Sequence, residues 1–211
     1  MKRIIIILAG LSIVLGCSYL DLKLLNFRSF DRGVCRIHDN SLQNGDLVFR
    51  QGRSVESYAV NMADSQKEFS HVGIVVVVYG KTYIVHAVPA DTKQDKAYVK
   101  METPDQFLAP DKATRCAVYR SAFSPAQLET VSRQALNFYT LRYTFDDEFD
   151  LSTTTKLYCT ELVLDAFSNA GIKLENIQAS EINFLVTKKK IVLPGEFLKN
   201  TSFREVNNSI K

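Results

Sequence analysis

Cys159 has the sequence surroundings that best fit a reactive thiol. It follows Tyr158 and begins a segment in which Leu162, Val163 and Phe167 recur at helical spacing, so we expect a helix that starts at the cysteine. A thiol in the first turn of a helix faces unpaired N–H groups and the positive end of the helix dipole, and both lower its pKa. The same N–H groups can hold an oxyanion. We therefore predict a nucleophile here; the alternative is a small apolar residue that seats the helix.

Two of the three histidines, His71 and His86, are expected to meet on a β-hairpin. The β-branched run 71–79 and the segment 82–88 predict two strands joined by a turn at 79–80. With that turn, His86 lies two residues from the position opposite His71, on the same face of the hairpin. Diagonal neighbours lie ~7–8 Å apart, within reach of two imidazoles. A register slip of one residue would place them on opposite faces.

A thiol at a helix start and two imidazoles on a sheet are the groups that a cysteine hydrolase needs. The thiolate attacks, one imidazole moves the proton, and a second polar group fixes the tautomer of that imidazole. No metal or other cofactor is required. Two alternatives stay open: His71, His86 and Cys159 are zinc-type ligands, although the sequence has no close-spaced ligand pairs, and a binding module would hold the same thiol in an inert state.

The elements that must position these residues indicate an α+β fold. A cap at Ser124 with Pro125 and Gln127 predicts a helix start, and apolar residues follow at helical spacing. Gly171 is the predicted stop of the helix that begins near Cys159. Further segments are predicted from local composition: strands at 47–50 and 117–120, and one or two helical turns at 55–62.

Composition and charge exclude several classes of protein. The chain has 211 residues, 46% of them hydrophobic, and its formal charge is only +3. These values exclude a disordered or collagen-like chain, and the net positive charge is too small to be typical of a nucleic-acid-binding protein. We expect one domain at 41–205, preceded by a tether or N-terminal extension at 17–40.

The first residues predict export and lipid anchoring. A basic head at 1–3 is followed by an apolar run at 4–15, which is shorter than the ~20 residues of a membrane-spanning helix. The run ends in Val14-Leu15-Gly16-Cys17, which resembles a bacterial lipobox. We therefore predict a signal peptide at 1–16, lipidation of Cys17, and a domain held at a membrane outside the cytoplasm. A plain secretory signal is the alternative, and the sequence does not say which membrane is used.

Two blocks of the sequence resemble the NlpC/P60 papain-like family. The first contains Asn44-Gly45-Asp46-Leu47-Val48-Phe49, Ser70-His71-Val72-Gly73-Ile74-Val75 and Ile84-Val85-His86-Ala87, and the second is Tyr158-Cys159-Thr160-Glu161-Leu162-Val163. In the ordinary family the cysteine helix precedes the histidine strands, whereas here it follows them. That order resembles the circularly permuted branch, and the form of the cysteine block is similar to the YaeF/YiiX group of permuted amidases.

The resemblance implies a fold and a set of roles. The fold would be a circularly permuted papain-like fold, with an antiparallel sheet packed against the nucleophile helix. Cys159 would be the nucleophile, His71 the general base and then acid, and His86 the orienting residue, although relatives often have an acidic residue at that position. Asp46 and Glu161 match motif positions that we interpret as structural, in a turn and at the helix start.

The implied function is a cell-envelope cysteine hydrolase that cleaves an amide through a thioester. Its substrate would be a peptidoglycan stem peptide or a related N-acyl amide, including a lipid-linked amide. The alternatives are a lipid acyltransferase or esterase, since a related permuted branch contains the lecithin-retinol acyltransferase-like enzymes, and a non-catalytic envelope binding lipoprotein. Neither a nucleic-acid partner nor a particular oligomeric state is implied.

Other candidate residues carry weaker signals. Cys35 and Cys116 are the two cysteines to which no other role is assigned, and in an oxidising compartment they could form a disulfide. The residues around them show no common disulfide pattern, so the sequence leaves their pairing open. His38 lies in a polar stretch and is expected at the surface. The run 188–190, three lysines, is expected to be a solvated charge run.

Overall fold

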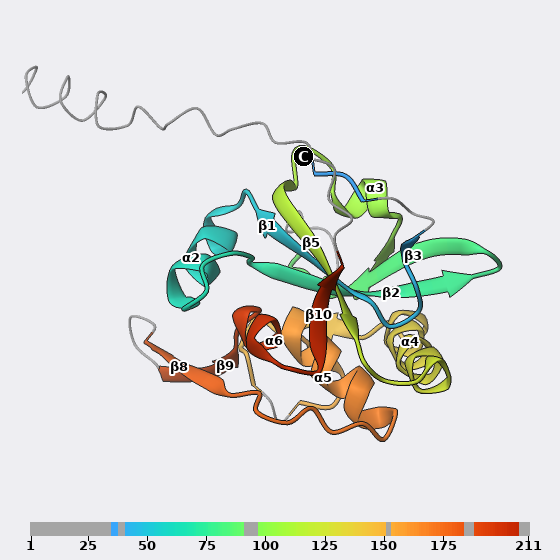
Figure 1. Ribbon diagram of the computed structural model, residues 1–211. Helices are drawn as coiled ribbons and strands as arrows, with labels where there is room; N and C mark the ends of the chain where they lie inside the picture. The colour runs from blue at the N-terminus through green and yellow to red at the C-terminus, as the bar shows by residue number, and fades with distance from the viewer. Residues whose placement is uncertain (1–34, 38–40, 91–96, 151–152, 184–187, 207–211) are drawn as a thin grey trace, which may run out of the picture. The chain divides into compact units, whose positions relative to one another are not determined.

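An antiparallel sheet of six strands organises the computed structural model, which describes residues 35–37, 41–90, 97–150, 153–183 and 188–206 (Figure 1). All pairings between neighbouring strands of this sheet are antiparallel. In spatial order the strands are β10 (Phe203–Val206), β5 (Ala113–Ser121), β1 (Leu47–Gly52), β2 (His71–Val78), β3 (Lys81–His86) and β4 (Lys100–Glu102). The predicted α+β class is confirmed.

Helices cover both faces of this sheet, as Figure 1 shows. On one face α4 and α5 pack on β2, and apolar side chains from both helices join those of the strands in one buried cluster. On the other face α3 supplies Phe107 to a second cluster. The helices are α2 (Val55–Ala63), α3 (Pro104–Phe107), α4 (Pro125–Thr140), α5 (Cys159–Asn169) and α6 (Gly195–Lys199).

Two short strand pairs lie outside the main sheet. The parallel pair is β6 (Thr144–Phe145) with β7 (Lys156–Leu157), and the antiparallel pair is β8 (Ala179–Asn183) with β9 (Lys188–Val192). The three lysines at 188–190 therefore begin a strand, which the prediction of a solvated charge run did not include. Lys188 forms an ion pair with Glu181 across this hairpin. None of the described helices is long and apolar enough to cross a membrane.

The predicted hairpin register is confirmed. Val78 pairs with Lys81 and Ile74 with Val85, so the turn lies at Tyr79 and Gly80. Tyr79 and Gly80 both adopt positive φ, at 50° and 74°, as a two-residue hairpin turn requires. The residues from the start of β2 to Val76 are buried, because both faces of the sheet are covered.

Local capping signals also form as predicted. The Ser124 side chain accepts from Gln127 N and the Gln127 side chain accepts from Ser124 N, which completes a capping box before Pro125.

The turn residue Asp46 is fully buried and accepts a hydrogen bond from Gln43 N at 2.9 Å. Arg120 of β5 donates two hydrogen bonds to the same carboxylate, so Asp46 also ties the turn to the sheet.

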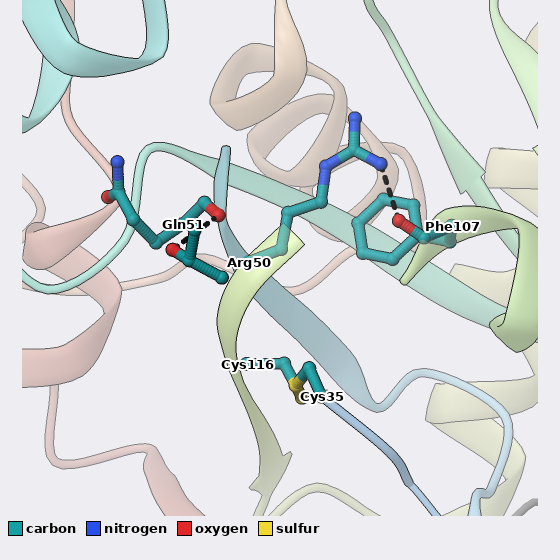
Figure 2. The surroundings of a disulfide bond; sticks show 6 residues. Cys35, Arg50, Gln51, Phe107 and Cys116 are labelled. Carbon is teal, nitrogen blue, oxygen red and sulfur yellow. Dashed lines mark hydrogen bonds between the residues drawn. A yellow bond between two sulfur atoms is a disulfide. The ribbon is translucent and has the colours of Figure 1, made fainter. Parts of the chain in front are cut away.

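A disulfide joins Cys35 to Cys116, which answers the question that the sequence left open. Cys116 lies on β5 opposite Arg50 of β1, and Figure 2 shows the bond beside these strands. The bond links positions 81 residues apart, so it ties the segment around Cys35 to the sheet. The predicted signal peptide, Cys17 and His38 lie outside the described residues.

Reduction of this disulfide is expected to lower the free energy of unfolding by about 2–4 kcal/mol, because a long loop is then free in the unfolded chain. Urea unfolding with and without reductant measures the effect. The double variant Cys35→Ser/Cys116→Ser is the matched control, since reductant should no longer shift its midpoint. An unfolding midpoint of the wild type that does not respond to reductant would contradict this role.

Candidate active site

Cys159 is the first residue of α5, as predicted, and hydrogen bonds on both sides of it fix the helix start. Glu161 accepts a hydrogen bond from Tyr158 N at 3.2 Å, so its predicted structural role is confirmed. The Thr160 hydroxyl donates to Val192 O at 2.6 Å, and Val192 N donates to the Tyr158 hydroxyl at 3.3 Å. The strand end at Val192 therefore holds the residues that flank the thiol.

The pKa of the thiol moves in the direction opposite to our expectation. Burial raises the pKa of Cys159 to about 11, although the nearby backbone N–H groups of Val72 and Thr160 and the charge of Arg50 act to lower it. The helix start thus lowers the pKa of the thiol as predicted, but the removal of the thiol from solvent raises that pKa by more. The resting group is a neutral thiol, so it needs a base when it attacks.

His71 and His86 meet, as the hairpin register predicts. Nε2 of His71 lies 2.9 Å from Nδ1 of His86, and the two rings are nearly perpendicular. His86 Nε2 lies 3.2 Å from a carboxylate oxygen of Glu102 on β4, and Lys112 donates to the other oxygen at 2.8 Å. Two imidazoles, a carboxylate and an ammonium group therefore form one line of hydrogen bonds.

The carboxylate at the end of this line determines the tautomers of both rings. An ionised Glu102 only accepts, so His86 Nε2 carries the proton that it donates. Neutral His86 then has its lone pair on Nδ1 and accepts from His71 Nε2. Neutral His71 is left with its lone pair on Nδ1. The network thus prepares Nδ1 of His71 to accept a proton.

Both rings are held neutral at pH 7. Burial lowers the pKa of His86 to about 4, against the opposing effect of its hydrogen bond to Glu102. Burial, aided by the charges of Arg50 and His86, holds the pKa of His71 well below its usual value. Burial alone would raise the pKa of Glu102, but its hydrogen bonds with His86 and Lys112 lower it to about 2.

Phe107 and Arg50 enclose the histidine pair. The Phe107 ring centroid lies 5.6 Å from that of His71 and 4.9 Å from that of His86. The Arg50 guanidinium lies 4.4 Å above the Phe107 ring and donates to Phe107 O at 2.5 Å, as Figure 2 shows. Arg50 is also the strand partner of His71. A fixed positive charge therefore lies near the two imidazoles and adds to the effect of burial in keeping them unprotonated.

The thiol and the histidines lie at one end of the sheet. The backbone N–H of Val72, which directly follows His71 on β2, lies close enough to the sulfur of Cys159 to lower its pKa. His86 and Cys159 also line the same cleft, of about 800 Å³. The three residues singled out in the sequence thus converge, and the arrangement has the parts required for acyl transfer by a thiol.

Two residues that contribute to this arrangement were not found from the sequence. Glu102 lies in a strand of three residues, too short to show an alternating pattern. Arg50 ends the predicted strand 47–50, and only its pairing opposite His71 gives it a role. The resemblance led us to expect an acidic residue at the position of His86. Here the acidic group is Glu102, which lies one hydrogen bond beyond His86.

The chain belongs to the family of permuted papain-like amidases described as YaeF/YiiX, C92 family, whose sequence model matches residues 41–206. The fold and the permuted order of the site agree with that class. The chain is 26% identical over 167 residues to the protein YiiX of Escherichia coli (strain K12), and the match covers 77% of each chain. The crystal structure of metalloprotein yiiX from Escherichia coli O157:H7 has the same fold, with a TM-score of 0.62 and 20% identity, over 79% of this chain and 97% of that chain.

Because that structural neighbour is called a metalloprotein, we asked whether the side chains of this chain could bind a metal ion. Within the described ranges, no group of three or more His, Cys, Asp or Glu side chains is arranged to hold a metal ion. The line of contacts at His71 and His86 ends on Glu102 and Lys112, and an ammonium group so close disfavours a bound cation. The described residues therefore do not fit a metal site, and no chemical step is assigned to one.

Proposed function

We propose that this cysteine hydrolase is a lipid-anchored amidase of the cell envelope, with Cys159 as its nucleophile and His71 as its base. The observation that carries the proposal is the hydrogen-bonded line from His71 through His86 to Glu102, at a cleft that the helix-start thiol of Cys159 also lines. His86 is a positioning residue, because it acts through His71. The line leaves a basic nitrogen on His71, and a neutral thiol needs such a base.

The reaction proceeds through a thioester. Cys159 Sγ attacks the carbonyl carbon of the amide while His71 Nδ1 takes the thiol proton, so the S–C bond forms and the carbonyl oxygen becomes negative. Backbone N–H groups at the start of α5 stabilise that oxygen. His71 gives its proton to the amide nitrogen, and the C–N bond breaks to release the amine. His71 then deprotonates a water molecule, which attacks the thioester carbon. The S–C bond breaks, the carboxylic acid leaves, and His71 returns its proton to the sulfur of Cys159.

The proposed location and substrate follow from the N-terminal sequence and the disulfide. A basic head, an apolar run and a lipobox-like Cys17 favour export and a lipid anchor. The bond between Cys35 and Cys116 supports an oxidising compartment. An enzyme anchored there would meet amides of the envelope, either in peptidoglycan stem peptides or in related N-acyl amides.

Release of amine tests the proposed function. The full chain, in a non-ionic detergent, is incubated with muropeptides and with N-acyl amides, and the freed amine is quantified. We expect amide turnover without added metal or cofactor. Absence of turnover across both substrate classes would contradict an amidase and favour the non-catalytic binding protein.

We expect kcat/KM not to decrease as the pH is lowered through 6.5, the ordinary pKa of a histidine. Only neutral His71 accepts the thiol proton, and its pKa is lowered, so the acid limb moves to lower pH. The raised pKa of Cys159, about 11, predicts no increase between pH 7 and 9 from thiolate formation.

Arg50 supplies a control for this profile. Arg50→Met removes a positive charge that lowers the pKa of both histidines, so the acid limb should move to higher pH. Arg50→Lys keeps the charge and should restore most of the wild-type profile. Rates measured from pH 4 to 9 compare the three proteins, and a wild-type acid limb at or above pH 6.5 would count against this assignment.

A further inference from the structure

Lys112 lies at the far end of the hydrogen-bonded line that begins at His71. Its ammonium group donates to Oε1 of Glu102 at 2.8 Å, while Oε2 of the same carboxylate lies 3.2 Å from Nε2 of His86. The thioester reaction takes no proton from this lysine. Because Lys112 binds the carboxylate rather than a ring nitrogen, any effect that it has on the reaction acts through Glu102.

The segment that connects Glu102 to Lys112 is held in place at several points. Thr103 caps α3 through a reciprocal pair of hydrogen bonds. Phe107 is fully buried and packs against both histidine rings. The backbone N–H of Lys112 donates to Ala109 O at 2.7 Å. The fold therefore holds the backbone of Lys112 beside β4, so the ion pair orders a side chain and not a whole loop.

The ion pair of Lys112 with Glu102 is less exposed than a typical surface pair. The two side chains are 36% and 15% exposed, whereas those of the pair Lys173 and Glu175 are 85% and 68% exposed. Water and salt screen exposed charges strongly and partly buried charges much less. The charge of Lys112 therefore acts on a carboxylate that is largely shielded from solvent and that also binds the buried His86.

One additional proton anywhere on this line removes the basic nitrogen of His71. On His71 itself, the proton occupies Nδ1. On His86, both nitrogens then donate, so Nε2 of His71 accepts and the proton of neutral His71 moves to Nδ1. On Glu102, the carboxyl group donates to Nε2 of His86, and both rings take the same reversed tautomers. The three groups therefore titrate as one unit with respect to the base.

We propose that Lys112 is a positioning residue of the amidase reaction, because its positive charge keeps this line free of an additional proton and so keeps the lone pair on Nδ1 of His71. The proposal rests on the proposed function, in which that nitrogen accepts the thiol proton. Burial alone would raise the pKa of Glu102, but its hydrogen bonds with His86 and Lys112 lower it to about 2. A cation beside a carboxylate has this effect because it favours the charged form.

Other charged side chains line the same cleft. They are Arg50, Arg53, Glu56, Lys100, Asp111 and Asp147. Beyond the effect of burial, the charges of Arg50 and Lys100 lower the pKa of His86. Lys112 is hydrogen-bonded to the carboxylate itself, so its replacement changes the charge at the end of the line and leaves these other groups in place.

A charge series at position 112 tests the proposal by the pH dependence of kcat/KM. The full chain and its variants Lys112→Arg, Lys112→Met and Lys112→Glu are compared on one amide substrate from pH 4 to 9. We expect Lys112→Met to move the acid limb up by about one pH unit, the usual effect of losing an opposite charge this close to a carboxylate. Lys112→Glu should move it further, and Lys112→Arg should keep the wild-type profile because it keeps the charge.

Nitrogen NMR of isotope-labelled histidine gives a second readout that needs no substrate. The chemical shift of a ring nitrogen reports whether it carries a proton, so it identifies the tautomer. We expect His71 and His86 to carry their protons on Nε2 at pH 7 in the wild type. In Lys112→Met the pH at which this state is lost should rise together with the acid limb. Lys173→Met is the matched control, since it removes the exposed pair with Glu175 and should change neither readout.

The outcomes separate this proposal from the amidase function. If Lys112→Met leaves the acid limb and the ring tautomers unchanged, the proposal is overturned while amide turnover remains. The same conclusion follows if Lys112→Arg moves both readouts as far as Lys112→Met does, because charge is then not the cause. If the wild type cleaves no amide, the amidase is rejected, and the ring tautomers alone decide whether the charge of Lys112 controls the line.

Discussion

Cys159→Ser is expected to lower kcat/KM for amide hydrolysis by at least about 10³-fold, because removal of a nucleophile also removes the covalent route. A serine hydroxyl in the same position is a weaker nucleophile and a poorer leaving group from the acyl-enzyme. The measurement is amine release under single-turnover and steady-state conditions. A variant that keeps more than a tenth of wild-type activity would show that another group attacks.

The fold of this variant is expected to be unchanged. The hydroxyl lies near the same backbone N–H groups of Val72 and Thr160 as the sulfur does, so the free energy of unfolding should change by less than about 1 kcal/mol. Ser168→Ala is a control on the same helix, because Ser168 is exposed, and it should leave activity unchanged. Urea unfolding of both variants separates loss of chemistry from loss of structure.

His71→Ala is expected to lower kcat/KM by about 10²–10⁴-fold, the usual contribution of a positioned general base. His86→Ala should cost less, about 10–10²-fold, because His71 keeps its ring and loses only the partner that fixes its tautomer. Equal losses in the two variants, measured on one substrate, would contradict the positioning role of His86.

A conservative variant distinguishes positioning from general packing. In His86→Gln the side-chain carbonyl can still accept from His71 Nε2, so activity should recover relative to His86→Ala. The alanine variant should also change the acid limb of the pH profile, since His86 contributes to the lowered pKa of His71. If glutamine and alanine gave the same rate and profile, His86 would serve packing alone.

Sequence patterns predicted the features that depend on neighbouring residues. The β2–β3 register follows from a two-residue turn and two β-branched runs, and it was enough to bring His71 and His86 together. The capping box at Ser124 likewise depends on residues three positions apart. Such features need no knowledge of the rest of the chain, because their partners are close in sequence.

Features that depend on distant packing could not be predicted. The raised pKa of Cys159 results from burial, which no local pattern reports, and it reverses the effect of the helix start. Glu102 reaches His86 only because β4 adds to the sheet edge beside β3. The pairing of Cys35 with Cys116 depends on the course of 81 residues.

The central claim is that the sulfur of Cys159 carries the acyl group during turnover, and rapid acid quench tests it most directly. The full chain is mixed with an N-acyl amide, quenched and digested, and the peptides are weighed by mass spectrometry. We predict that the peptide containing Cys159 gains the mass of the acyl group, and that this gain disappears in Cys159→Ser. Amide cleavage with the acyl group on a different residue, or with no acylated peptide at any quench time, would contradict the claim.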